Sequence, residues 1–346
     1  MTSLPAPRPR VALHDIAPVA WEHPADRAAL NALRAVPGVD EVIRKVLGVL
    51  GGEAGIRMLF QGNAVRVGPT QYPMLWALHI ENCATFGWET IPELYVTQTP
   101  VFNAGAYGVD NPFIVIHSSA LEILDEDELR VLLAHELGHV MSGHALYSTI
   151  AEIILIVSAG MLPVLAAIVL LPVRLAFLEW YRKSELSADR AGLLGSQDVA
   201  ASMRLFMKMA GGGNTAIVRP GDLNLEPFLQ QANEYANNNE GLNVLWKIIN
   251  TLALTHPMNV VRAAEVQVWI RSGAYERIVG GEYPRRGTAE AKRPWTDDAR
   301  EAGAYYRDEV KDAVGHVAEA AKKAARQARD AFQQAFDDRG KGQGAA

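Results

Sequence analysis

A long uncharged segment places the strongest constraint on how this chain can fold. Residues 153–173, IILIVSAGMLPVLAAIVLLPV, contain no charged side chain, and about 20 apolar residues are enough to cross a bilayer as one helix. One straight helix over this run would carry the chain about 30 Å. The residues before and after the run would then lie on opposite sides of a membrane. If residues from both sides of the run form one site, the run cannot cross the membrane once as a single helix.

A short polar motif lies on the N-terminal side of this run. His135, Glu136 and His139 form the pattern HELGH, and in a helix two residues four apart project from one face, so both imidazoles can reach one metal ion. A capping signal, Asp125 with Glu128, and apolar residues at helical spacing behind it predict that helix. Zinc accepts imidazole nitrogen and lowers the pKa of a bound water to about 7. Glu136 is then placed to take a proton from that water.

A second polar motif lies on the C-terminal side of the run. Glu185 and Asp189, in SELSAD, stand four residues apart on one face of a predicted helix. Like charges at this spacing are mildly destabilising unless a cation lies between them, and a catalytic zinc needs a third protein ligand. By spacing alone, a solvated face balanced by Arg182, Lys183 and Arg190 explains the pair equally well.

Taken in order along the chain, five segments resemble the HtpX-like and CAAX-prenyl-protease-like zinc metallopeptidases. The segments are NAGAYG (103–108), FIVIHSSAL (113–121), DEDELRVLLAHELGHVMSGH (125–144), SELSADRAG (184–192) and THPMNVVR (255–262), and the resemblance covers roughly residues 70–272. HExxH alone is moderately specific, whereas the ordered set is strongly specific. The resemblance implies a zincin-like endopeptidase core of the gluzincin type.

The resemblance also implies a ligand set. In that family the glutamate of the ExxxD element is the third zinc ligand, which is Glu185 here, beside His135 and His139. Asp189 would accept a hydrogen bond from a ligand imidazole, that of His135, and so orient it.

Further site residues follow from the other matched segments. The family's His-Pro element maps onto His256, which is implied to approach the metal or to steady the oxyanion; a capped or core histidine is the alternative. Asn103 and Ala104 are implied to lie near the substrate-binding edge. His144 lies off the ligand face and is expected to be a structural partner, and Arg262 is expected to pair with a carboxylate near the site.

The predicted fold class is α+β and predominantly helical. It comprises a zincin-like metalloprotease core with a small antiparallel sheet, a hydrophobic helical hairpin and a long C-terminal helix. Two strands are predicted, over residues 93–97 and 113–117. The predicted divisions are a flexible arm (1–25), a helical preamble (26–69), the metallopeptidase domain (70–275) with the hairpin inserted (150–176), and a linker with an Ala-rich helical tail (276–346).

The zinc site constrains the apolar run. Because His139 and Glu185 must both lie within about 2.0–2.2 Å of one ion, the run must return to the side that it left. Two full crossings need about 40 apolar residues, so a shorter hairpin remains, which dips into one leaflet or packs on the protein. Related family members carry membrane segments at this location, which favours contact of residues 153–173 with the cytoplasmic membrane, the active site on the cytoplasmic side. A soluble cytoplasmic protein is the alternative.

Composition disfavours other partners. The 346 residues have a formal net charge of -6, which offers no basic surface for nucleic acid.

The single cysteine, Cys83, allows no intrachain disulfide. The first twenty residues contain charges and several prolines where a secretory signal needs an unbroken apolar segment.

These expectations combine into one function. The chain is expected to be an endopeptidase with one Zn²⁺, Glu136 as general base and His256 assisting at the oxyanion, acting on polypeptides in membrane-associated processing or quality control. Two alternatives are a membrane-associated chaperone-like binding protein with a non-catalytic zinc site, and a zinc hydrolase of a non-peptide substrate. The glutamate base argues against the first, because a structural zinc site is usually closed by four protein ligands.

Overall fold

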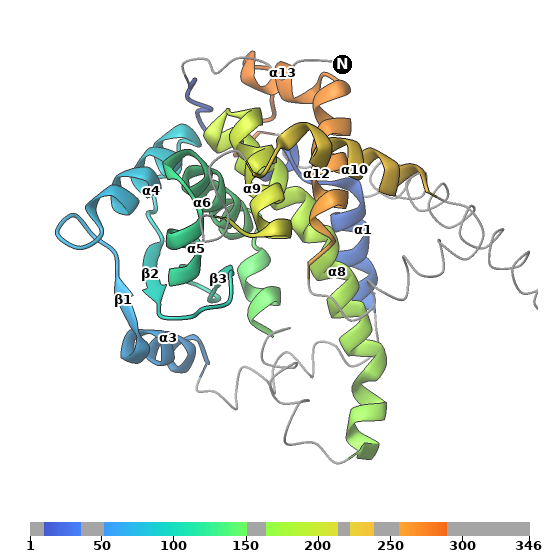
Figure 1. Cartoon of the computed structure of the whole chain (residues 1–346). Helices are drawn as coiled ribbons and strands as arrows, with labels where there is room; N and C mark the ends of the chain where they lie inside the picture. Colours follow the sequence, from blue (N-terminus) through green and yellow to red (C-terminus); the bar gives the residue numbers. More distant parts are fainter. Residues whose placement is uncertain (1–9, 36–51, 151–163, 214–221, 239–255, 289–346) are drawn as a thin grey trace, which may run out of the picture.

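The fold is described from a computed structural model, which defines residues 10–35, 52–150, 164–213, 222–238 and 256–288 (Figure 1). The helices that build the site are α1 (Pro24–Ala35), α6 (Glu126–Met141), α8 (Val164–Ser196), α9 (Val199–Gly211) and α12 (Asn259–Arg271). The others are η1 (Pro18–Ala20), α3 (Gly52–Asn63), α4 (Pro73–Thr85), α5 (Ser118–Ile123), α10 (Leu225–Asn237) and α13 (Ala274–Val279). The α+β, predominantly helical fold class is confirmed.

A four-stranded sheet lies beside the helices. Its strands are β1 (Ala64–Arg66), β2 (Glu93–Thr97), β3 (Ala104–Tyr107) and β4 (Phe113–His117), in the order β1-β2-β4-β3. The two predicted strands are β2 and β4. They pair in parallel, whereas the other two pairings are antiparallel, so the sheet is mixed and not antiparallel as predicted. The reason is topological: the chain leaves β2 for the far edge and returns in the β3–β4 hairpin, which makes β4 run in the direction of β2.

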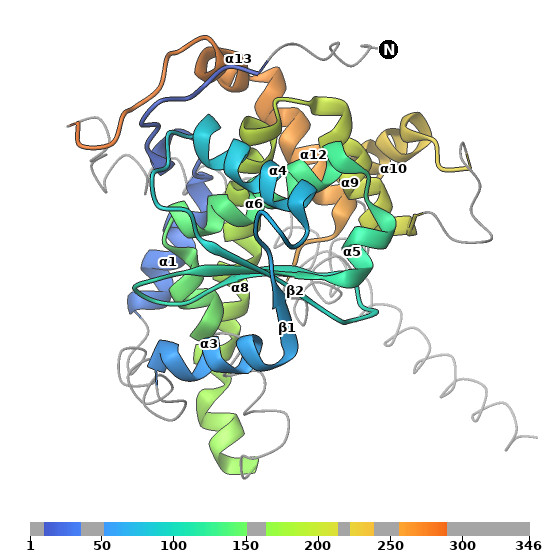
Figure 2. The ribbon, with the colours of Figure 1, turned by 90° about the vertical axis from the view of Figure 1, so that its left-hand side faces the viewer.

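The two faces of the sheet pack against different helices. Side chains alternate along a strand, and Leu94 and Ile116 point into the main core with α4 and α6, while Tyr95 and Val115 point to a smaller cluster that includes Ile56 of α3. Accordingly, α3 lies on the opposite side of the sheet from α4 and α6 (Figure 2). Strands β2, β3 and β4 are therefore largely buried, and the sheet supports α6 from one side.

Helix α6 begins at the predicted capping box. The Glu128 backbone N–H donates to Asp125 Oδ1 at 3.0 Å, and the Asp125 N–H donates to Glu128 Oε2 at 2.9 Å. Glu128 is fully buried and also accepts a hydrogen bond from Lys208 Nζ of α9 at 2.5 Å. The start of α6 is thus fixed to a neighbouring helix.

Small residues let α6 and α8 cross at close range. A Cβ atom added to Gly138 would lie 2.5 Å from the Cβ of Ala191, and one added to Gly195 would collide with the Cβ of Ala134. Real Cβ atoms do not approach so closely, so at each of these two points the glycine backbone of one helix lies directly against an alanine methyl group of the other. This crossing sets HELGH on α6 against SELSAD on α8.

The N-terminal segment belongs to the core. Leu13 and Trp21 are 1% and 0% exposed, and the Gln197 side chain after α8 bonds to both the N–H and the C=O of Val11. The prediction of a flexible arm is therefore wrong for residues 10–25: single large apolar side chains anchor a stretch that lacks regular periodicity. The rest of the arm lies outside the described residues.

The apolar run is described only in part. Residues 151–163, which contain the centre of the predicted hairpin, lie outside the described residues, as does the predicted C-terminal helix within 289–346. Residues 164–173 form the first part of α8, which continues without a break to SELSAD (Figure 1). In the described part of the chain, no helix has the length and apolar content needed to span a membrane.

The close contact between α6 and α8 predicts how adding one methyl group at the contact changes stability. Gly195→Ala should lower the free energy of unfolding by roughly 1–3 kcal/mol, because the added methyl group overpacks the contact with Ala134. Gly62→Ala is the control, since a Cβ there meets nothing within 4 Å, and it should be neutral or stabilising by up to about 1 kcal/mol. Urea unfolding measures both, and equal stability of the two variants would contradict the packing described.

Candidate metal centre

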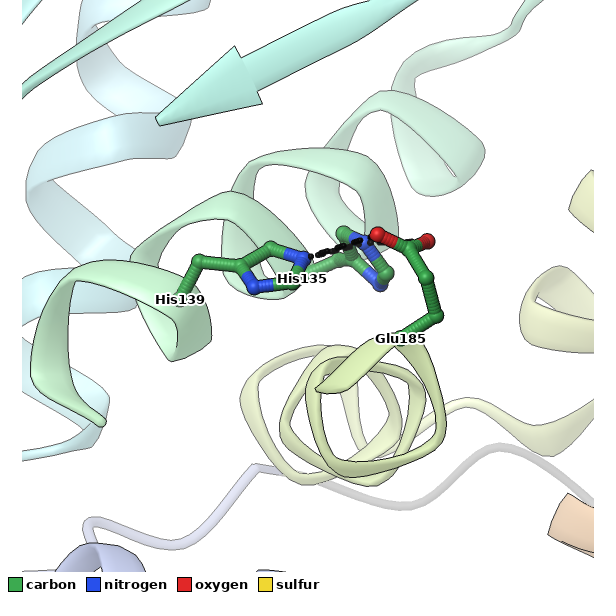
Figure 3. Close-up of side chains that lie close together, drawn as sticks. All are labelled: His135, His139 and Glu185. Atoms are coloured by element: carbon green, nitrogen blue, oxygen red, sulfur yellow. Dashed lines mark hydrogen bonds and ion pairs between the residues drawn. The ribbon is translucent and has the colours of Figure 1, made fainter. Parts of the chain in front are cut away.

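Three buried ligand atoms converge where α6 and α8 cross. His135 and His139 project from α6 toward Glu185 on α8 (Figure 3). The Nε2 atoms of the two histidines are 3.2 Å apart, and Glu185 Oε1 and Oε2 lie 3.2 Å from His139 Nε2 and 3.5 Å from His135 Nε2. Ligands on a tetrahedral zinc at about 2.0–2.1 Å are separated by roughly 3.3 Å. The spacing is therefore that of a zinc ligand set.

The chemistry of the cluster calls for a cation. Glu185 is 1% exposed, and its Oε2 accepts no hydrogen bond from the described residues, although Arg262 Nη2 lies 3.4 Å away. Leaving a buried carboxylate oxygen without a partner costs free energy. A metal ion between Glu185 and the two imidazoles would remove this cost, so the residues present fit zinc.

The pKa values of the two histidine ligands also indicate that the cluster favours a positive charge. Burial lowers the pKa of His135, but hydrogen bonds with Asp189 and Glu185 outweigh it and raise the pKa to about 10. Burial dominates at His139 and lowers its pKa to about 4. The carboxylates therefore favour a positive charge at His135, which a metal ion would supply in place of the proton, and His139 is already neutral, as a metal ligand must be.

Asp189 and Arg262 support the first ligand from behind. Asp189 Oδ1 lies 3.1 Å from His135 Nδ1, the ring nitrogen opposite the metal-facing Nε2. Arg262 of α12 donates to both Asp189 oxygens, at 2.8 and 2.5 Å. The carboxylate is thus held by a bidentate charge-assisted pair and can orient His135.

Glu136 lies beside the ligands with one oxygen unused. It is 3% exposed, and its Oε2 has no hydrogen-bond partner among the described residues. Burial, partly offset by His135, raises the pKa of Glu136 to about 7. A carboxyl group with a pKa near neutrality suits proton transfer.

A cavity of about 310 Å³ opens beside these side chains. Asn103, Ala104 and His256 line it together with His135, Glu136 and Glu185, so the structure brings these three predicted residues to the site. His256 Nε2 lies 3.6 Å from Glu185 Oε1, and the Tyr181 ring packs edge-on against the His256 ring at 5.4 Å. Apolar lining comes from Phe102, Leu132, Met209 and Met258.

The structure adds a contact that motif reasoning did not assign. His144 Nδ1 lies 3.1 Å from His139 Nδ1, and Asp26 Oδ2 of α1 lies 3.1 Å from His144 Nε2. His144 lies three residues beyond the end of α6, and Asp26 precedes HELGH by more than 100 residues. No local pattern marks this pair.

Two imidazoles from HELGH and a glutamate from a later helix define the gluzincin type of metallopeptidase site. Residues 80–270, more than half of the chain, match the model of peptidase family M48. The chain belongs to this family and is a zinc metalloendopeptidase, as the resemblance predicted.

Named relatives agree with the family assignment. The chain is 35% identical over 265 residues to the plastoglobule-localized metallopeptidase 48, chloroplastic, of Arabidopsis thaliana, covering 75% of this chain and 74% of that protein. It is 32% identical over 114 residues to a protease HtpX homolog of Tropheryma whipplei, covering 30% and 39%. A Sulfurihydrogenibium HtpX homolog is 46% identical over 65 residues, covering 18% and 22%. No solved structure matches the chain.

The ligand geometry predicts the metal content of a variant. Glu185→Gln keeps the size of the side chain but removes its charge, so the protein should lose most of its zinc on dialysis against a weak chelator. Glu179→Gln changes a 40%-exposed glutamate on the same helix and should keep one zinc per chain. Elemental analysis measures both, and full zinc content in Glu185→Gln would remove Glu185 from the ligand set.

Proposed function

We propose that this chain hydrolyses internal peptide bonds of polypeptides, using one zinc ion held by His135, His139 and Glu185. The observation that carries the proposal is that His135, Glu185 and Glu136, with its unused oxygen, line one cavity, and that the ligand atom of His139 lies within 4.8 Å of those of His135 and Glu185. When bound, zinc would polarise the scissile carbonyl and acidify a water molecule.

The chain's own residues would carry out the proton transfers. Glu136 takes a proton from the attacking water through its free Oε2 and later delivers it to the leaving amine. His256, at the cavity wall, donates a hydrogen bond to the oxyanion. Tyr181, which packs edge-on against the His256 ring, would restrict the orientation of that imidazole.

The substrate would align as a strand on the sheet. β3 is the last strand in the sheet order, and within the described residues it pairs only with β4. Its first residue, Ala104, and the preceding Asn103 line the cavity. An extended peptide added along β3 would make main-chain hydrogen bonds and pass the metal site, which suits broad side-chain tolerance.

Replacement of the base separates metal binding from catalysis. Glu136→Gln should keep zinc, because Glu136 is not a ligand, yet reduce cleavage of an unfolded protein such as casein by about 100- to 10,000-fold, which is the contribution of general-base catalysis. Zinc content and casein cleavage are measured on the same samples.

Each result has a distinct meaning. Unchanged casein cleavage in Glu136→Gln would remove Glu136 from the mechanism. Wild-type protein that holds zinc but cleaves no polypeptide would favour the chaperone-like binding protein or a hydrolase of another substrate class.

We further propose that the enzyme works at the cytoplasmic face of a membrane, in protein processing or quality control. The support is the uncharged run 153–173, which is too apolar for an ordinary surface segment. The run is too short for two full crossings, so contact through one leaflet is the form proposed.

Membrane contact predicts retention in the pellet. After alkaline carbonate extraction the wild-type protein should remain with the membranes, whereas the double variant Ile154→Glu, Leu155→Glu should move to the supernatant, because charged side chains are costly in the hydrocarbon layer, up to about 2.5–3.5 kcal/mol each at the centre of a spanning helix. Complete recovery of the untagged wild-type protein in the soluble fraction would contradict the proposal.

A further inference from the structure

The two candidate histidine ligands have different supports. His135 is backed directly by the Asp189 carboxylate, at 3.1 Å from its Nδ1. His139 is backed by another imidazole, because its Nδ1 lies 3.1 Å from His144 Nδ1. The far nitrogen of that second ring, His144 Nε2, lies 3.1 Å from Asp26 Oδ2. Each ligand imidazole is thus backed by a carboxylate. Asp189 backs His135 directly, whereas Asp26 of α1 backs His139 through the additional imidazole ring of His144.

Hydrogen bonding gives the second arrangement one direction. When His139 Nε2 faces a metal ion its proton lies on Nδ1, so His139 donates to His144 Nδ1. His144 must then carry its own proton on Nε2, and it donates to Asp26, which as a carboxylate can only accept. Each group therefore determines the tautomer of the group before it.

Asp26 is held so that it can end this chain of hydrogen bonds. It is 2% exposed, and Ser187 Oγ donates to the same Oδ2 at 2.5 Å. Burial opposes ionisation, but His144 and Ser187 hold the pKa of Asp26 below its usual value. Asp26 also lies in the first turn of α1, where the helix dipole favours a negative charge.

The same contacts join α1 to the ligand helix. Ser187 Oγ, which donates to Asp26, also accepts the backbone N–H of His23 at 2.9 Å. Ser187 stands on α8 two residues after Glu185, and α1 runs along α8 (Figure 1). The start of α1 is therefore held against the helix that supplies the third ligand.

We propose that Asp26 and His144 are positioning residues for the metal centre, acting on His139 as Asp189 acts on His135. On this proposal, which rests on zinc binding as proposed above, the N-terminal segment 10–35 is part of the metal site. Carboxylates behind ligand imidazoles fix the ring orientation and raise ligand basicity, and their loss commonly costs 10- to 100-fold in metal affinity.

The test measures zinc affinity and does not depend on peptidase activity. Asp26→Asn keeps the size of the side chain and removes the charge, and it should weaken zinc binding by about 10- to 100-fold in competition with a chromogenic chelator. The visible spectrum of the Co²⁺-substituted protein should change as well, because the His139 ring is less restrained. Glu265→Gln is the control. Glu265 Oε2 lies 3.6 Å from Nε2 of His23, a residue of the N-terminal segment, but Glu265 contacts no candidate ligand. The zinc affinity of this variant should match that of the wild type.

A double variant tests the order of the contacts. His144→Gln should weaken zinc binding at least as much as Asp26→Asn. The double variant should bind zinc no more weakly than His144→Gln alone, because the hydrogen-bonded path from Asp26 to His139 runs through His144.

Several outcomes would overturn the proposal. Zinc affinities within twofold of wild type in both single variants would do so. A metal-free Asp26→Asn protein that loses thermal stability but keeps its zinc affinity would also do so, because a purely structural pair would behave in this way. Wild-type protein that binds no zinc at all would overturn the proposed function together with this inference, whereas tight wild-type binding with unaffected variants would overturn this inference alone.

Discussion

The close approach of α6 and α8 is the constraint on which the rest of the structure depends. Along α8, Glu185, Ala188, Gly192 and Gly195 share one face, and three of these four have no side chain larger than a methyl group. The backbones can therefore meet, and a short glutamate side chain is enough to bring its carboxylate within 3.2 Å of His139 Nε2. Larger residues at the crossing would move the third ligand out of reach of the other two.

Charge balance is the second element of the account. The crossing buries Glu185 and Asp189 on one face, and Arg262 pairs fully only with Asp189. Removing a partner from a buried ionic cluster is strongly destabilising, so the remaining negative charge needs another cation. Metal binding at such a site contributes to folding stability as well as to catalysis. The sheet, α9 and α12 serve this arrangement by holding α6 and the arginine in place.

Sequence reasoning succeeded where a short-range rule governs the geometry. The positions of His135 and His139 follow from helical spacing, the start of α6 follows from a capping box, and β2 and β4 are continuous runs of apolar, β-prone residues. It failed where distant contacts decide. β3 is AGAY, too small and too short to read as a strand, and the parallel pairing of β2 with β4 depends on which edge β3 occupies. Trp21 and Asp26 belong to stretches without motif, and only their packing against α6 and α8 shows that they are part of the core and of the site.

The central claim is that one zinc ion is bound by two imidazoles of α6 and one carboxylate of α8. Anomalous diffraction at the zinc absorption edge, from crystals of the protein as purified, tests it most directly. The account predicts a single strong peak within about 2.0–2.2 Å of His135 Nε2, His139 Nε2 and a Glu185 carboxylate oxygen. A peak at any other position, or a Glu185 side chain directed away from the two imidazoles, would contradict it.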